Sequence, residues 1–480
     1  MELTSPFFTN DAIAFGLLML CLAFVFFTSS SEQPGWKKFY TYVPALLLCY
    51  FLPALLSWPL GLIAPHWYEA GLLDHLAQLG QSLPENGMSY AEVKDWIQKN
   101  DIAGTKAFEQ HSQLYFVSSR YLLPASLVLL CISIDFKGII NLGPKALIMF
   151  FTATLGIVIG GPIALLLIGT IAPDIVGASD AGELWRGLST IAGSWIGGGA
   201  NQTAMKEIYE VSDQLFSSMV VIDVVVANIW MGFLLYGANI SDKIDGWFKA
   251  DASAIKDLKE RVEDYQAQIA RIPSTTDYFI MLGIAFGITA LSHWGADVIA
   301  PFFDNINEQS KLLIGTNGEP LYPNGKLVEW GISSIMSGFF WLIVISTILG
   351  VLLSFTKARQ IEGAGASKIG SLFIYILVAT IGMKMDIGEV FNHLDAFAIG
   401  LVWMLVHVSL LLFVGKLIKA PFFFTAVGSQ ANVGGAASAP VVAAAFSPAL
   451  APVGVLMAVL GYALGTYGAI LCATLMQWVS

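Results

Sequence analysis

Two short segments rich in glycine and neutral polar side chains are the best candidates for chemistry in this chain. The first runs from Gly193 to Ala204; the second runs from Gly428 to Ala439, 235 residues further along, and the two align without a gap. Amide and hydroxyl groups of this kind can hold a polar solute or a cation. We expect substrate contacts from Ser194, Asn201, Gln202, Thr203, Lys206, Ser429, Gln430, Asn432 and Ser438, and we expect no catalytic residue.

Strongly apolar sequence surrounds both segments. The chain of 480 residues is 56% hydrophobic and 12% charged, with a mean hydropathy of +0.69. Several windows of 18 or more apolar residues predict an all-α polytopic membrane protein whose surroundings are the lipid bilayer, and not a β-barrel. No basic patch indicates a nucleic-acid partner. Four cysteines within apolar spans predict buried free thiols, and we expect no metal site and no cofactor.

Each glycine-rich segment is expected to form a re-entrant hairpin, over Trp185–Ser212 and over Pro421–Ser447. Two limbs of roughly 10–12 residues, at ~1.5 Å per residue, would each reach about half-way across the hydrocarbon. The returning limbs begin near Asn201 and Ala436, and their N-termini would favour an anionic group. The ends of the entering limbs would offer carbonyls to a cation. The alternative is that glycine and serine only allow close helix packing.

Charged and amide side chains near the first hairpin predict ion coupling. Asp223 lies deep within an expected span and Asn228 follows it, so we predict a Na⁺ or H⁺ site there. Lys206 is either a counter-charge for an anionic substrate or a structural partner of Glu207 or Asp223, and both interpretations stay open. His407, alone in its span, is expected to be a core residue.

Ten membrane spans are expected, five in each half of the chain, with one hairpin per half. Because five is odd, the halves would be inverted and the hairpins would enter from opposite faces. Asp135 and Asp386 would end equivalent spans. The expected spans are Asp11–Thr28, Tyr40–Ile63, Leu114–Ile134, Lys145–Ile171, Asp213–Ala238, Tyr278–Ala300, Gly331–Ser354, Ile369–Met385, Ala396–Gly415 and Leu450–Trp478.

Two polar segments separate these spans. Within residues 64–113, Ser89 and Glu92 form a capping-box signature for a short helix to about Lys99, and Trp67–Leu79 is expected to be an amphipathic helix on the membrane surface. Apolar residues at three- and four-residue spacing over 255–272 predict either a coiled coil joining two protomers or a helix packed on its own chain.

The predicted domain plan follows this order. It has scaffold helices at 1–63, an extracytoplasmic insert at 64–113, core helices with hairpin 1 at 114–238, a cytoplasmic linker helix at 239–276, scaffold helices at 277–355, and core helices with hairpin 2 at 356–480. Lys37 and Lys38 in the first link place it inside, so both termini are expected outside a bacterial inner membrane.

Four motifs resemble the YjcL-type family of uncharacterised bacterial membrane proteins: Trp195–Glu207, Val221–Gly232, Asn432–Ala445 and Leu460–Gly468. That family is grouped with the sodium/glutamate symporter and the cation/proton antiporter and anion transporter superfamily. The resemblance implies ten spans, two opposed hairpins and a mobile core that slides on a fixed scaffold. It implies no particular substrate.

These observations predict a secondary active transporter with elevator-type alternating access, working as a homodimer. It would move a small anionic or zwitterionic organic solute with Na⁺ or H⁺. One alternative is a cation/proton antiporter that binds no organic substrate; another is a membrane sensor or receptor whose insert binds a ligand. An intramembrane hydrolase using Ser194 or Ser429 is disfavoured, because no histidine or carboxylate lies near either serine in sequence.

Overall fold

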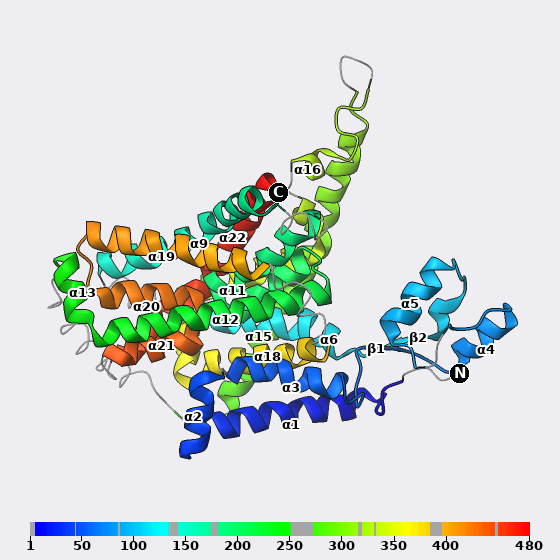
Figure 1. Cartoon of the computed structure of the whole chain (residues 1–480), viewed down its shortest axis with the longest axis horizontal. Helices are drawn as coiled ribbons and strands as arrows, with labels where there is room; N and C mark the ends of the chain where they lie inside the picture. The colour runs from blue at the N-terminus through cyan, green and yellow to red at the C-terminus, as the bar shows by residue number, and fades with distance from the viewer. Residues whose placement is uncertain are drawn as a thin grey trace. The chain divides into compact units, whose positions relative to one another are not determined.

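Helices make up nearly all of the regular structure in the computed structural model of this chain (Figure 1). The structure describes residues 5–43, 45–84, 87–132, 134, 143–173, 181–250, 272–314, 319–330, 333–384, 396–446 and 450–480. The coiled-coil prediction over 255–272 lies outside these residues except for Ile272. Asp135 and Asp386 also lie outside them.

Among the described residues, seven helical segments are long and apolar enough to cross a membrane, or up to nine if two bent pairs each count as one span. The seven are Asp11–Ser29 (α1), Leu114–Ile132 (α6, η2 and α7), Pro144–Ile171 (α9), Asp213–Asn239 (α12), Thr275–Lys311 (α15), Ala366–Lys384 (α18) and Ala396–Leu417 (α19). These segments confirm the prediction of an all-α polytopic membrane protein.

The remaining expected spans depart from straight helices. Gly338–Ser354 (α17) continues into Lys357–Ala364 (η4) with a bend of 95°, and Ala451–Val479 (α22) bends by 53° between Leu456–Tyr462 and Leu464–Val479. The expected span Tyr40–Ile63 holds only the shorter helix Ala45–Ser57 (α3), preceded by Pro34–Tyr42 (α2). The ten-span layout therefore stays a prediction.

The chain divides into two compact units: residues 1–120 with 375–388, and residues 121–374 with 389–480. The first unit holds α1, α2, α3 and the insert, and the second holds the helices around both glycine-rich segments. This division differs from the six-part plan predicted from the sequence, which stays untested.

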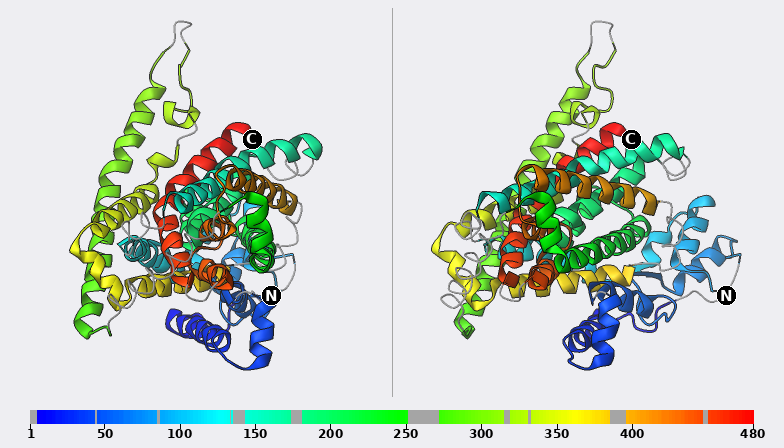
Figure 2. Two further views of the ribbon diagram at one scale, coloured as in Figure 1. Left: turned by 90° about the vertical axis from the view of Figure 1, so that its left-hand side faces the viewer. Right: turned by 60° about the vertical axis from the view of Figure 1, so that its left-hand side comes forward.

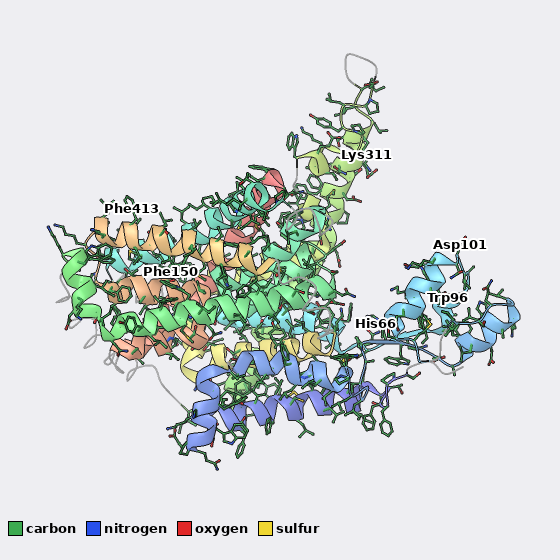
Figure 3. The ribbon with its side chains drawn as sticks, in the orientation of Figure 1. His66, Trp96, Asp101, Phe150, Lys311 and Phe413 are labelled. Atoms are coloured by element: carbon green, nitrogen blue, oxygen red, sulfur yellow. The ribbon has the colours of Figure 1, made fainter. Side chains whose placement is uncertain are left out.

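The 64–113 insert has its own small core. Strand β1 (His66–Tyr68) pairs antiparallel with β2 (Glu109–His111), and helices α4 (Gly71–Gln78) and α5 (Tyr90–Lys99) accompany them with the short η1 (Thr105–Phe108). His66 and Trp96, labelled in Figure 3, belong to this insert. Its buried cluster consists of Tyr68, Leu72, Leu76, Leu83, Val93 and Ile97.

The prediction of one continuous amphipathic helix over Trp67–Leu79 is therefore wrong. Trp67 lies in β1, and only Gly71–Gln78 is helical. The apolar face of α4 is covered by the insert itself, since Leu72 and Leu76 are at most 1% exposed. The sequence did not indicate the short strand, because the apolar positions of residues 67–79 also fit the spacing of a helix.

The capping box at the start of α5 is confirmed. Ser89 Oγ accepts a hydrogen bond from the Glu92 backbone N–H, and Glu92 accepts bonds from the Ser89 backbone and hydroxyl at 2.7 and 2.9 Å. These bonds stabilise the ionised carboxylate, so the pKa of Glu92 lies below its usual value of 4.5.

The second unit contains two packed groups of helices. In one, buried residues of α7 (Leu123–Ile132) pack against α15, η4 and the start of α18. In the other, α9 packs against α20 (Phe422–Val433), α21 (Gly435–Phe446) and α22; Phe150 of α9, labelled in Figure 3, lies within this cluster. Figure 2 shows α20, α21 and α22 beside one another from two further directions.

Substituting Ser89 tests whether the capping box holds the insert together. Ser89→Ala should cost about 1 kcal/mol and raise the open fraction of the insert roughly 5-fold, measured by limited proteolysis. The pKa of Glu92 is lower in the folded insert than in the unfolded chain. The ionised carboxylate therefore stabilises the insert at any pH above the unfolded-state pKa, and this stabilisation is lost as the pH falls through the folded-state pKa. The difference between variant and wild type should therefore shrink below about pH 4.

Ser82→Ala, an equally small change at an exposed serine of the same insert, is the matched control. Equal proteolysis of both variants, or a difference that does not depend on pH, would contradict this account of the capping box.

Candidate functional site

The first glycine-rich segment folds back on itself. Helix α11 (Ala181–Ile208) is interrupted at Gly198, whose φ of 75° and ψ of −174° are accessible only to glycine. A Cβ atom built on Gly193 would lie 2.6 Å from the carbonyl oxygen of Asn201 and 2.9 Å from Met205 Cγ. Residues eight and twelve positions apart touch only if the limbs run antiparallel, so α11 is a hairpin with its tip at Gly198.

The second glycine-rich segment is also a hairpin. Gly435, between α20 and α21, has a φ of +58°. The Phe422 and Phe423 rings, at the start of α20, lie 6.0 and 5.3 Å from the Phe446 ring at the end of α21. The ends of the two limbs are therefore side by side, as antiparallel limbs require.

The tips of the two hairpins meet. A Cβ atom built on Gly435 would lie 3.9 Å from Gly198 Cα, within van der Waals contact. Tyr462 of α22 also borders this point, with its ring 3.8 Å from a Cβ atom built on Gly198. Two segments 235 residues apart in the sequence are therefore brought together at their glycine breaks.

Asn201 and Asn432 fix the hairpins to neighbouring helices in the same manner. The Asn201 side chain donates to the Gly197 carbonyl at 2.9 Å and accepts from Thr466 Oγ1 of α22 at 2.6 Å. Asn432 donates to the Gly428 carbonyl at 2.9 Å and accepts from Thr154 Oγ1 of α9 at 2.8 Å. Both amides are fully buried and bonded to protein through oxygen and nitrogen, so these interactions hold the limbs in place.

Asp223 of α12 lies against hairpin 1 and accepts three hydrogen bonds from it. Ser194 Oγ donates to Oδ2 at 2.6 Å, Trp195 Nε1 donates to Oδ1 at 2.6 Å, and Gln202 Nε2 donates to Oδ2 at 3.0 Å. Asp223 is only 5% exposed and forms no ion pair with any residue in the described part of the chain. A buried carboxylate without a counter-ion is costly, so the site is suited to a bound cation.

Lys206 has partners other than Asp223. Its Nζ lies 2.8 Å from Asp213 Oδ1 and 3.7 Å from Glu207 Oε1, and 5.6 Å from the Phe216 ring centroid. Of the two structural pairings expected from sequence, the one with Glu207 is present, and Asp213 is an additional partner that sequence reasoning missed. The substrate role predicted for Lys206 stays a prediction.

Ser429 of hairpin 2 takes part in a directed chain of hydrogen bonds. Trp230 Nε1 of α12 donates to Ser429 Oγ at 2.8 Å, His407 Nε2 of α19 lies 2.8 Å from the same oxygen, and His407 Nδ1 lies 3.1 Å from the Ala153 carbonyl of α9. A carbonyl only accepts and an indole N–H only donates, so Nδ1 of His407 carries the proton and Ser429 donates to Nε2.

Among the described residues, hairpin 2 holds two buried polar atoms without a hydrogen-bond partner, Thr425 Oγ1 and Gln430 Oε1. Gln430 lies nearer the tip of the hairpin. Its Nε2 donates to Ser438 Oγ at 2.7 Å across the turn, but its buried Oε1 has no hydrogen-bond partner among the described residues. An acceptor left unpaired in the interior is expensive unless a ligand supplies a donor.

The other predicted residues bond within their own helices. Thr203 Oγ1 donates to the Gly199 carbonyl at 3.0 Å, and Asn228 Nδ2 donates to the Val224 carbonyl at 2.7 Å. The ion-coupling role predicted for Asn228 stays a prediction. Among the described residues, no group of three or more His, Cys, Asp or Glu side chains is placed to hold a metal ion.

Three partners of the site were not predicted to have a function: Trp195, Trp230 and His407. One signal for Trp230 was available, since it follows Asp223 by seven residues and therefore lies on the same face of one helix. Trp195 could have been suspected as the only aromatic residue in the first repeat copy. His407 lies 22 residues from Ser429, and no local pattern connects the two.

Alanine at the two neighbouring glycines of hairpin 1 tests the tip geometry. Gly198→Ala should cost about 1–3 kcal/mol, because its backbone conformation excludes a Cβ atom, and should lower the thermal unfolding midpoint of the purified protein. Gly199→Ala is the matched control: its backbone is ordinary and a Cβ atom there would meet only Ile374 Cγ2, at 3.9 Å. Equal midpoints for both variants would contradict the described turn.

Comparison with known proteins agrees with the motif resemblance. A family model described as protein of unknown function (DUF819) matches residues 104–479. The uncharacterized membrane protein YjcL of Bacillus subtilis (strain 168) is 24% identical over 368 residues, which cover 74% of this chain and 82% of YjcL. Most of the insert and the first helices precede the matched region. The predicted resemblance is thereby confirmed, and the chain belongs to the DUF819 family of YjcL-type membrane proteins.

Proposed function

We propose that this protein is a secondary active transporter in which the two hairpin tips form the substrate site. The observation that carries the proposal is the close approach of the two tips, where a Cβ atom on Gly435 would lie 3.9 Å from Gly198 Cα. Near the first tip lies the buried Asp223 carboxylate, which has no counter-ion among the described residues. Irregular backbone at membrane depth is tolerated only where protein or a water-filled cavity satisfies it. Broken helices meeting at one point are typical of transporter substrate sites.

We further propose that the two halves of the chain are inverted repeats with five membrane spans each. Each half contributes a hairpin, a preceding helix (α9 or α19) and a following helix (α12 or α22). Five spans per half would place the hairpins on opposite sides of the membrane. We place the protein in the bacterial inner membrane with both termini outside.

The substrate we propose is a small anionic or zwitterionic organic solute. Helix α21 begins at the tip, so its free N–H groups and positive dipole end favour an anionic group. The unpaired Oε1 of Gln430 calls for a hydrogen-bond donor, which a hydroxyl or ammonium group would supply. A solute that carries both an anionic group and a donor satisfies both features.

A cation at Asp223 would drive transport. The structural alternative, an ion pair between Lys206 and Asp223, has no support, because Lys206 pairs with Asp213 and Glu207. The carboxylate is therefore available to take up Na⁺ or H⁺ from one side and release it to the other. A cation/proton antiporter without an organic substrate would use the same residue, but it would not explain the unpaired Gln430 oxygen.

Alternating access would be of the elevator type, with the hairpins and their helices moving as one body in a homodimer. Helix α12 supports this, because Asp223 bonds hairpin 1 and Trp230, two turns further on, bonds hairpin 2. Neither hairpin can shift without α12 unless these bonds break. Helix α15 packs against α7 and the start of α18, and none of its described residues belongs to the buried cluster around hairpin 2, which suits a scaffold helix.

A hydrolase is the second candidate, because the structure brings His407 within 2.8 Å of Ser429. A serine with an adjacent histidine base is the arrangement of a nucleophile. Three features favour a structural role: both residues are fully buried, Trp230 donates to the serine oxygen, and Nδ1 of His407 faces a backbone carbonyl rather than a carboxylate. We expect no labelling of Ser429 by a fluorophosphonate; specific labelling that Ser429→Ala abolishes would favour the hydrolase instead.

Ligand-dependent unfolding tests the transporter proposal. We would screen small carboxylates, with and without amino or hydroxyl groups, against their uncharged amides. A true ligand stabilises only the folded state, and at 100 times its Kd it should contribute about 2.7 kcal/mol. We expect at least one carboxylate, and not its amide, to raise the unfolding midpoint of wild type.

Gln430→Leu should abolish this stabilisation, whereas Gln309→Leu, the same change at an exposed glutamine of α15, should preserve it. Uptake of the stabilising compound into proteoliposomes would follow. If no carboxylate stabilises the protein, or if both variants respond equally, the proposed substrate site is wrong.

A further inference from the structure

We propose that the coupling cation is a proton and that it is carried on Oδ2 of Asp223. This inference rests on the proposed function and names the ion left open there. The evidence is the chemistry of the three groups that donate hydrogen bonds to the carboxylate. Each of these groups limits the protonation states that Asp223 can adopt without losing a hydrogen bond.

The two carboxylate oxygens have partners of different chemistry. Oδ1 accepts from Trp195 Nε1, and an indole N–H can only donate. Oδ1 must therefore remain an acceptor whether or not Asp223 is ionised. In a neutral carboxylic acid that oxygen is the carbonyl, so the proton belongs on the other oxygen.

The partners of Oδ2 can both reverse their roles. Ser194 donates to it through a hydroxyl, which also has lone pairs that accept. Gln202 donates through its amide nitrogen and can present its amide oxygen after a rotation of the side chain. A proton on Oδ2 would thus be received by Ser194 or Gln202, and every polar group would keep a partner.

Sodium fits this arrangement less well. Hard cations bind oxygen ligands, and the unwound backbone of transporter sites usually supplies them as carbonyls. Two of the three groups directed at the Asp223 carboxylate are N–H donors, which repel a cation. A sodium ion would have to displace both, and the Trp195 indole has no oxygen to offer in exchange.

Among the described residues around Asp223, no other charged side chain is bonded to its carboxylate. Helices α20 and α21 contain no titratable residue, and His407 of α19 is bonded to Ser429 and Ala153. The remaining titratable or charged residues with described side chains, on elements packed against α12, are Arg186, Lys206 and Glu207 of α11, Asp242, Lys243 and Asp245 of α13, and Lys416 of α19. None of them forms an ion pair or hydrogen bond with Asp223 in the part of the chain that the structure describes.

The proton step itself is a transfer between water and one oxygen. A hydronium ion on one side of the membrane gives its proton to Oδ2, and the carboxylate becomes neutral. After the core has moved, water on the other side accepts the proton, and the carboxylate is restored. No other bond is made or broken, and the substrate is unchanged.

Infrared difference spectroscopy of the purified protein tests this directly, without a known substrate. The carbonyl stretch of a protonated carboxyl group should appear in the difference spectrum when wild type is acidified. The band should be absent in Asp223→Asn and present in Asp213→Asn, which instead removes the half-buried partner of Lys206. Replacing choline chloride by sodium chloride at constant pH should leave it unchanged.

The position of the proton has its own signature. With the proton on Oδ2, the carbonyl oxygen is Oδ1, and its hydrogen bond from Trp195 lowers the stretching frequency. Trp195→Phe should therefore raise the frequency of the band, while Ser194→Ala should leave it nearly unchanged. A shift with Ser194→Ala and none with Trp195→Phe would place the proton on Oδ1.

The outcomes separate this inference from the proposed function. Sodium is the coupling ion if it removes the band at fixed pH, or if Asp223 stays ionised and only sodium perturbs its carboxylate bands. In that case the proton inference fails and the transporter proposal stands. If neither proton nor sodium perturbs any band that Asp223→Asn abolishes, cation coupling at Asp223 fails as well.

Discussion

The set of hydrogen bonds to the Asp223 carboxylate is the interaction on which the rest of the site depends. A buried negative charge must be stabilised or neutralised. Here hydrogen bonds from Ser194, Trp195 and Gln202 do so, and Asp223 has no basic partner within the described part of the chain. All three donors come from hairpin 1, so the state of this one carboxylate is tied to the position of the hairpin. A cation that changes the charge also changes these bonds.

Helix α12 extends this dependence to the second hairpin. Trp230, on the same face as Asp223, donates to Ser429, and the chain continues through His407 to the backbone of α9. Four elements are thereby joined by directed bonds in a packed apolar environment. The glycine breaks at Gly198 and Gly435 allow the two hairpin tips to approach each other closely.

Much of this site was predictable from sequence. The repeat at Gly193 and Gly428 indicated both hairpins, and an isolated carboxylate in an apolar span indicated Asp223. The pairing Lys206–Asp213 was not predicted, because it joins the last turn of α11 to the first turn of α12 and depends on how the chain turns between the two helices. The tip contact, the unpaired oxygen of Gln430 and the His407–Ser429 bond depend on which helices pack together, and no local spacing encodes that.

The central claim is that the hairpin tip opens to each side of the membrane in turn. It is tested most directly by Gly199→Cys in a background where Cys21, Cys49, Cys131 and Cys472 are alanine, probed with a membrane-impermeant maleimide from either side of oriented vesicles. Gln81→Cys, exposed in the insert, is the control that should react from one side only. Labelling of Gly199→Cys from both sides is the result we predict, and labelling from one side only, under every condition of pH and sodium, would contradict alternating access at this tip.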